Sequence, residues 1–247
     1  MTLYLSRLRL SQSPQIDALS SLLDPANRKL PGEDPIERGR RTDAHHRLVW
    51  SAFAGDSAAK RDFLWRSDGN GVFLALSRRP PGQSPLFDPP EVKLFDPELQ
   101  VGTRLAFILR CNATRTFKTD ELTANGKVRK KQRDVVMLAL HGLAKDERAD
   151  VRHQIAQDEG SRWLVGQGGR AGFAVADPDK DVVVADYSTA SLPGHIGKRK
   201  GQPQYGILEM SGMLSVTDPS AFLLALADGF GRAKAFGCGL MLLRRAG

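Results

Sequence analysis

The chain has 247 residues, of which 41% are hydrophobic, so it can build one large domain or two ordinary domains around a proper core. Its 36 lysines and arginines exceed its 28 aspartates and glutamates, and the formal net charge of +8 favours a polyanionic partner, nucleic acid ahead of a membrane surface. No apolar run reaches about 18 residues and "MTLYLSRLRLSQS" lacks the features of a signal peptide, so we expect a cytoplasmic protein without a membrane span. The two cysteines, Cys111 and Cys238, fit no metal spacing and are typical of buried residues in a reducing compartment.

The first half predicts strands separated by loops. Residues 2–10 are short and apolar, which is typical of a strand, whereas residues 11–40 are polar and rich in proline. This second stretch indicates a long loop or insertion, apart from a short helix around "IDALSSLL". A hairpin is expected in "RDFLWRSDGNGVFLALSRRP", where "DGNG" supplies turn residues with positive φ, and another strand is expected in "VGTRLAFILRCN".

A helix that follows residue 42 carries two adjacent histidines. Asp43 can cap it, and His46, Val49 and Trp50 share one face, with His45 to one side. In the first turn the helix dipole disfavours the imidazolium, and a neutral imidazole can act as a general base. Asp43 and any bound phosphate would act in the opposite direction, so the sequence leaves the net pKa shift open. The alternative is that His46 is a hydrogen-bonded residue at the edge of the core.

The second half repeats this rhythm after the basic stretch "NGKVRKKQRD", which we interpret as a mobile junction with a turn at Asn125-Gly126. The helix "TDPSAFLLALADG" has the clearest signals: Thr217 or Asp218 as cap, Pro219 at the first position and Gly229 at the end. The other expected elements are, in order, the helix "ADVRHQIAQDEGSRWLV", the strand "KDVVVADYST", the basic loop "GHIGKRKGQPQ", the strand "YGILEMSGMLSV" and the strand "GLMLLRR".

Each half therefore follows the order strand, helix, hairpin, weak helix, strand. This order predicts an α+β protein of two tandem ferredoxin-like (RRM-like, βαββαβ) domains. We place the N-terminal domain, with the histidine helix, at residues 1–120 and the C-terminal domain, with a glycine-rich loop, at residues 134–247. Residues 121–133 form the basic junction. The second helix of the first half has little periodic signal.

The glycine-rich loop is "DGFGRAKAFGCGLMLL". Glycines let backbone N–H groups converge on an anion, and the loop also holds two cations. We expect phosphate contacts from Gly229, Gly231, Arg232, Lys234, Gly237 and Gly239. The alternative, a helix end followed by a tight turn, explains Gly229 but not the other three glycines. The loop lacks G-x-x-x-x-G-K-[ST] and is not a nucleotide-binding P-loop.

Two further basic stretches have the composition of loops that follow a nucleic-acid backbone, although solvated charge runs are common. Their candidate contact residues are Lys127, Arg129 and Lys130 in the first stretch, and Lys198, Arg199 and Lys200 in the second. The second stretch is favoured because Gly197 and Gly201 bracket it as a loop between two strands.

No metal site and no cofactor are expected. His45 and His46 point about 100° apart on a helix and cannot readily share a metal. His141, His153 and His195 are scattered, without metal-ligand partners at suitable spacing. No G-x-S-x-G occurs, and nothing indicates a cysteine–histidine pair.

Taken together, these stretches resemble the CasE-type CRISPR-associated endoribonucleases. The resemblance is carried by "LYLSRLRL", "HRLVWSAFAGDSAAKRDFLWRSDGNGVFLALSRRPP", "FILRCNATR" and "VTDPSAFLLALADGFGRAKAFGCGLMLL". The last of these is the family's glycine-rich signature. Residues 11–40 and 140–165 match poorly.

The resemblance implies metal-independent cleavage of the repeat hairpin in a CRISPR precursor RNA, on the 3′ side of its stem. The adjacent 2′-hydroxyl attacks and leaves a 2′,3′-cyclic phosphate and a 5′-hydroxyl. It also implies that the enzyme keeps its product hairpin as a subunit of a multi-protein surveillance complex. A non-catalytic hairpin-binding subunit of that complex is the alternative.

Residue by residue, the family's catalytic histidine lies four positions before the helix tryptophan, which gives His46, with His45 as the alternative. A tyrosine is frequent three residues before that histidine, where this chain has Asp43. A carboxylate cannot donate to a phosphate oxygen as a phenol can. We therefore expect a cation, Arg47 or Lys234, to stabilise the extra negative charge of the phosphorane.

Overall fold

A computed structural model describes residues 1–14, 16, 34–53, 61–123, 125–192 and 203–246. The basic loop with Lys198, Arg199 and Lys200 lies outside these residues, as does nearly all of the short helix expected around residues 16–23. Of the described residues, none belongs to a helix that is both long and apolar enough to cross a bilayer.

The first sheet is antiparallel and has the strand order β2-β3-β1-β4. The expected hairpin is confirmed: Asn70 and Gly71 have positive φ between its two strands. α2 covers one face, where Leu8, Val49 and Phe73 are buried together. The elements are β1 (Tyr4–Arg9), α2 (Pro35–Ser51), β2 (Phe63–Gly69), β3 (Val72–Ser77) and β4 (Glu91–Leu94).

The second sheet has the order β11-β5-β10, continued by β8 and β9, which both pair with β10. Phe107, Leu164 and Phe222 lie in its core, which the sheet shares with α4 and α6. The main elements are β5 (Arg104–Cys111), α4 (Arg148–Ala171), β8 (Phe173–Ala174), β9 (Val182–Ser191), β10 (Gln204–Val216), α6 (Pro219–Asp228) and β11 (Met241–Arg245). The short helices α3 (Val135–His141) and α5 (Pro178–Asp181) complete this half.

Both strand orders are those of a ferredoxin-like domain, in which the crossovers bring the first and third strands to the centre. The prediction of two tandem ferredoxin-like domains in an α+β protein is thereby confirmed. The first domain lacks the second helix of the ferredoxin-like fold, because residues 78–90 between β3 and β4 contain no helix. This absence of a helix explains why the sequence shows little helical periodicity for the second helix of the first half.

The junction between the halves differs from the prediction. β5, which the sequence places in the first half, pairs with β10 and β11 of the second sheet. Within the predicted basic junction, residues 121–123 and 125–133 belong to a two-stranded ribbon of β6 (Thr114–Leu122) and β7 (Val128–Asp134) and to the turn between its strands. The turn at Asn125-Gly126 is confirmed, since Gly126 has φ 72°. We propose that the domain boundary falls within residues 95–103 instead.

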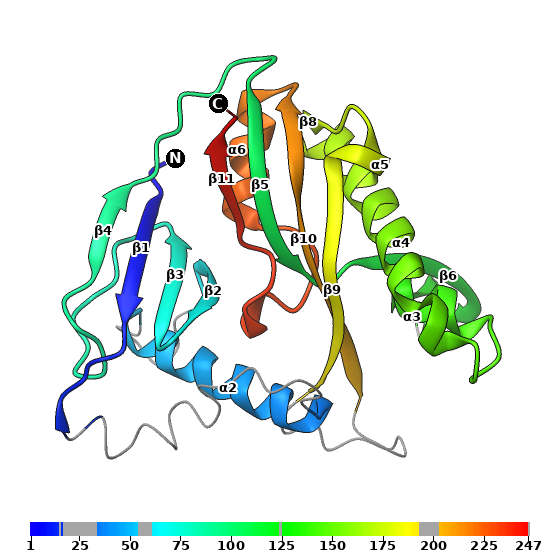
Figure 1. Cartoon of the computed structure of the whole chain (residues 1–247), viewed down its shortest axis with the longest axis horizontal. Helices are drawn as coiled ribbons and strands as arrows, with labels where there is room; N and C mark the ends of the chain where they lie inside the picture. Colours follow the sequence, from blue (N-terminus) through cyan, green and yellow to red (C-terminus); the bar gives the residue numbers. More distant parts are fainter. Residues whose placement is uncertain (15, 17–33, 54–60, 124, 193–202, 247) are drawn as a thin grey trace.

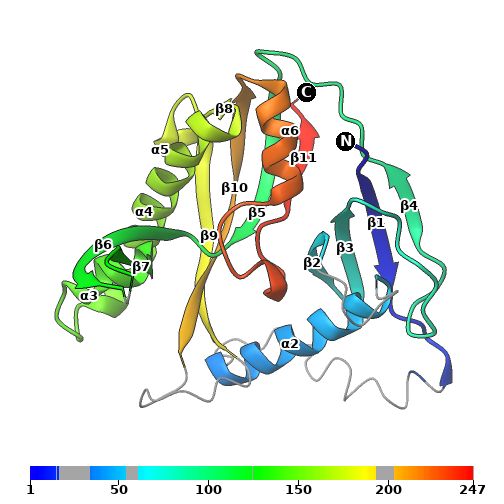
Figure 2. The same ribbon diagram turned by 180° about the vertical axis from the view of Figure 1, so that it is seen from behind.

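The helix α2 runs beneath both sheets (Figures 1 and 2). Its start is fixed by Asp34, whose side chain accepts from the Ile36 N–H at 3.0 Å, and by Pro35 at the first turn. Arg38 donates to the backbone oxygen of Thr189 in β9 at 2.6 Å. A Cβ on Gly39 would lie 2.2 Å from the Ser191 oxygen, so only glycine allows this close approach. α2 therefore belongs to the first domain by topology and contacts the second directly.

Candidate active site

The two histidines lie inside α2, about three turns from its start. The prediction that Asp43 caps the helix is wrong, because residues 35–42 continue the helix back to the true cap, Asp34. Asp43 instead pairs with Arg47 at 3.0 Å, four residues on. The dipole of the first turn consequently cannot act on His45 or His46.

His45 is the buried member of the pair. Its side chain is 6% exposed, and its ring meets the edges of Phe73 and Trp65 with centroids 5.1 and 6.3 Å apart. His46 is half-buried at the margin of the core, 5.9 Å from the Trp50 ring and 6.5 Å from the Trp65 ring. The prediction that His46 faces the core and His45 lies aside is thus reversed. His46 keeps its contact with Trp50 and is the one that reaches the surface.

The structure gives the direction of the His46 pKa that the sequence leaves open. Burial lowers the pKa of His46 below 6.5, and the nearby charges of Arg61 and Arg47 lower it further, while Asp43 opposes them. His46 is therefore mainly neutral at pH 7 and can accept a proton. The Nδ1 atom of His46 is buried and has no hydrogen-bond partner.

Arg61 is a residue that the sequence reasoning missed. It precedes β2, and its Nη1 atom is buried without a hydrogen-bond partner. Its charge lowers the pKa of both His46 and Lys234. Only its place just before a predicted strand could have drawn attention to it, and that signal is not specific.

The glycine-rich loop brings Lys234 to the same place. The loop contains a 3₁₀ turn, η1 (Lys234–Phe236), which packs against α2 and β2. Figures 1 and 2 both show this turn pointing down toward α2. Lys234 is half-buried, and its Nζ donates to the backbone oxygen of Asp228 at 2.6 Å. Burial lowers the pKa of Lys234, an effect that Asp228 opposes.

The four glycines of the loop all have positive φ: Gly229, Gly231, Gly237 and Gly239. They also lie too close to their neighbours for a side chain. A Cβ would come 2.5 Å from the Asn112 oxygen at Gly231 and 3.2 Å from the Trp65 ring at Gly237. Packing within the protein therefore explains the three glycines that a helix end alone does not. Phosphate contacts from these glycines, and from the exposed Arg232, stay a prediction.

The basic ribbon carries Lys127, Arg129 and Lys130, all exposed. Glu121 pairs with Arg129 at 2.9 Å, whereas Lys130 lies opposite Lys118 in the register, so positive charge accumulates there. Figures 1 and 2 place the ribbon beside α3 and α4, away from α2. The structure thus joins His46, Arg47 and Lys234 in one region and leaves the ribbon residues separate.

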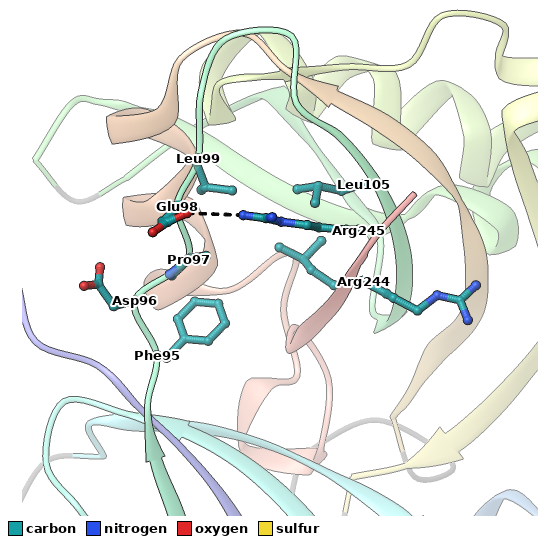
Figure 3. Close-up of a pocket in the computed structure, with 9 residues that line it drawn as sticks. Phe95, Asp96, Pro97, Glu98, Leu99, Leu105, Arg244 and Arg245 are labelled. Carbon is teal, nitrogen blue, oxygen red and sulfur yellow. Dashed lines mark hydrogen bonds and ion pairs between the residues drawn. The ribbon is translucent and has the colours of Figure 1, made fainter. Parts of the chain in front are cut away.

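Within the described ranges, no three side chains of histidine, cysteine, aspartate or glutamate come together in a way that could hold a metal ion. A hollow of about 330 Å³ is lined by residues 95–99 and the ends of β5 and β11. Figure 3 shows Arg245 reaching across it to Glu98, at 3.5 Å. It lies at the end of the sheet remote from α2 and contributes nothing to the histidine site.

Comparison with known proteins gives one family and one fold. A family model described as "CRISPR associated protein" matches residues 3–245. Cse3 of Thermus thermophilus, solved bound to an RNA representing a pre-cleavage complex, superposes with TM-score 0.61 at 20% identity, covering 99% of this chain and 100% of that chain. Cas6e of Escherichia coli K-12 superposes with TM-score 0.51 at 19% identity, covering 98% and 100%.

A chain from a CRISPR RNA-guided surveillance complex in a pre-nicking state superposes with TM-score 0.52 at 15% identity, covering 98% of this chain and all of that one. At these identities the superpositions show a shared fold. No curated protein sequence matches the chain.

Proposed function

The chain belongs to the CRISPR-associated protein family, and from this premise we propose that it is an endoribonuclease that cleaves the repeat hairpin of a CRISPR precursor RNA. Similar structures are described as a CRISPR endoribonuclease bound to RNA and as part of a surveillance complex. One observation carries the proposal for this chain. The 3₁₀ turn that carries Lys234 packs against α2, which carries the half-buried His46, and the charge of Arg61 lowers the pKa of both side chains.

This arrangement suits attack by the RNA's own 2′-hydroxyl. His46 accepts the 2′-hydroxyl proton as the 2′-oxygen bonds to the adjacent phosphorus. The bond from phosphorus to the 5′-oxygen then breaks, which leaves a 2′,3′-cyclic phosphate and, once that oxygen gains a proton from solvent, a 5′-hydroxyl. The reaction needs a base and positive charge near the phosphorane, and no metal ion enters it.

Positive charge has to come from side chains other than residue 43. Asp43 accepts hydrogen bonds and cannot donate one when ionised, and its pairing with Arg47 neutralises part of that cation. Arg61 and Lys234 are half-buried, so their charges are less screened than that of Arg47, whose side chain is 79% exposed. We assign the stabilisation of the phosphorane to Arg61 and Lys234, with Arg47 contributing from the rim.

A second candidate function is a hairpin-binding subunit that does not cleave, and the Asp43–Arg47 pair is the observation that favours it. In either case the basic ribbon, the glycine-rich loop and the loop with Lys198, Arg199 and Lys200 would hold the RNA. The product hairpin would stay bound as this subunit joins a surveillance complex.

The test uses the repeat hairpin with EDTA present and a matched RNA that lacks the 2′-hydroxyl at the cut site. We expect cleavage of the first RNA at the 3′ side of its stem, and equal binding without cleavage of the second. Loss of cleavage in EDTA that a divalent ion restores would contradict metal independence. Tight binding of both RNAs with no cleavage of either would establish the second candidate.

A further inference from the structure

Trp65 in β2 touches both parts of the proposed site. Its side chain is 1% exposed, so it has one fixed position in the core. On one side its ring is within 22° of parallel to the His46 ring, with centroids 6.5 Å apart. It also meets the His45 ring edge-on at 6.3 Å. The indole therefore forms part of the wall against which the histidine helix packs.

The other side of the same indole carries the glycine-rich loop. Its Nε1–H donates to the backbone oxygen of Ala235 at 3.2 Å, one residue after Lys234. Gly237, which ends η1, lies so close that a Cβ there would be 3.2 Å from the indole Cη2 atom. Both ends of this turn have positive φ, 53° at Ala233 and 73° at Gly237.

A turn of three residues has few hydrogen bonds of its own to hold it. The bond from the Phe236 N–H to the Ala233 oxygen, at 2.8 Å, closes it internally. The bond from Lys234 Nζ to the Asp228 oxygen ties the turn to the rest of the second domain. The bond from the Trp65 indole N–H ties it to β2. Of these ties, the one from Trp65 crosses from the first sheet to the loop that carries Lys234.

We propose that Trp65 is a positioning residue, which fixes η1 and hence Lys234 relative to His46. The inference rests on the proposed function. It adds to it a residue, Trp65, that holds η1 of the second domain in place against α2 of the first. Displacement of a reacting group by about 1 Å can lower a rate about 10²-fold, so the loss of this tie has a measurable consequence.

The variant Trp65→Phe keeps an aromatic ring beside His46 and removes the N–H bond to Ala235. Trp163→Phe is the matched control. The Trp163 indole is also buried, donates to the backbone oxygen of Thr114 at 3.3 Å, and lies under the other end of the same loop near Gly231. Both variants lose one indole hydrogen bond, but only the first touches η1.

The measurements are the single-turnover cleavage rate at saturating enzyme, the Kd for the RNA lacking the 2′-hydroxyl, and the thermal unfolding midpoint. We expect Trp65→Phe to lower the rate about 10- to 100-fold, with a Kd within about twofold of the wild type. Trp163→Phe should keep the wild-type rate. Equal rates for the two variants would overturn the inference while the cleaving wild type upholds the proposed function. A wild type that does not cleave would overturn both.

A double variant separates action through Lys234 from a general effect on the fold. If Trp65 acts by placing Lys234, Trp65→Phe should slow the Lys234→Ala enzyme by no more than about twofold, because the group it positions is already gone. Rate losses that multiply in the double variant would overturn the inference, whatever the unfolding midpoints show.

Discussion

The helices α2 and α4 occupy the same topological position, the first crossover of a ferredoxin-like domain, yet they pack differently. α4 buries Ala156, Trp163 and Leu164 in the core of its own sheet. α2 divides its length: Leu48 and Val49 enter the first core, whereas Gly39 lies against β9 of the second sheet. The helix that serves two sheets is the one that carries the histidines, so the position of His46 depends on how the domains meet.

Charged side chains also join the two domains. Arg66 of β2 lies 3.9 Å from Glu209 of β10, and Arg110 of β5 donates to the same carboxylate. Burial lowers the pKa of Arg66, although Glu209 opposes this effect. Removing one partner of such a buried group would leave a charge uncompensated, so the network favours one relative placement of the sheets.

The largest expected effect comes from removing the proposed base while the packing of α2 and α4 is left unchanged. His46→Ala should lower the single-turnover rate about 10²- to 10⁴-fold, the usual contribution of a positioned base. Hairpin affinity should change little, because one half-buried imidazole is a small part of a basic interface. Rate and affinity on the same RNA check this.

His45→Ala is the control within the same helix. It removes a ring packed among Trp65 and Phe73 and should lower the free energy of unfolding by about 2 kcal/mol. Its rate should stay within about tenfold of the wild type. A slow His45→Ala beside a wild-type rate in His46→Ala would show that the wrong histidine has been assigned.

The next effect tests whether α2 needs the second sheet. Gly39→Ala places a methyl group 2.2 Å from the Ser191 oxygen and must displace the helix, which should lower the rate about 10²-fold. Gly166→Ala in α4 meets nothing within 4 Å and should stabilise the protein by up to about 1 kcal/mol with an unchanged rate. If Gly39→Ala cleaves as fast as Gly166→Ala, the packing of α2 on β9 does not position His46.

The smallest effect concerns the ribbon, which is remote from the histidines. Replacing Lys127, Arg129 and Lys130 with alanine should weaken hairpin binding and reduce the slope of log K against log salt by about 0.7 to 0.9 for each phosphate that the variant no longer neutralises. Lys130 should contribute most, because Arg129 is already paired with Glu121. Lys180→Ala, which removes an exposed lysine paired with Asp177, is the control. An unchanged slope in the triple variant would mean that the ribbon is a solvated charge run.

Local patterns predicted most elements but not their partners. The short apolar run of β1 and the turn at Asn70-Gly71 act within a few residues, and so does the cap of α6, where the Asp218 side chain accepts from the Ala221 N–H at 3.0 Å. The pairing of β5 with β10 and β11 joins residues about 100 to 140 positions apart, which no local pattern encodes. The domain boundary that we propose within residues 95–103 rests on that pairing.

The start of α2 shows how two possible N-caps compete. Asp34 and Asp43 are both good caps, and Asp34 is followed by proline at the first helical position. Moving the start by nine residues placed His45 and His46 in the helix interior, where the dipole of the first turn no longer acts on them. Burial and Arg61 lower the His46 pKa instead, and both arise from contacts between elements far apart in the chain.

The most direct test is the pH dependence of single-turnover cleavage by the wild type and by His46→Ala at enzyme concentrations far below saturation, where the rate reports the pKa of the RNA-free enzyme. Protonation removes the base, so the wild-type rate should fall as pH drops, with a midpoint below the ordinary histidine value of 6.5 and a plateau through pH 7 to 8. The His46→Ala rate should be low and should lack this acidic limb. A wild-type midpoint above 6.5, or the same acidic limb in His46→Ala, would contradict the assignment of His46 as the general base.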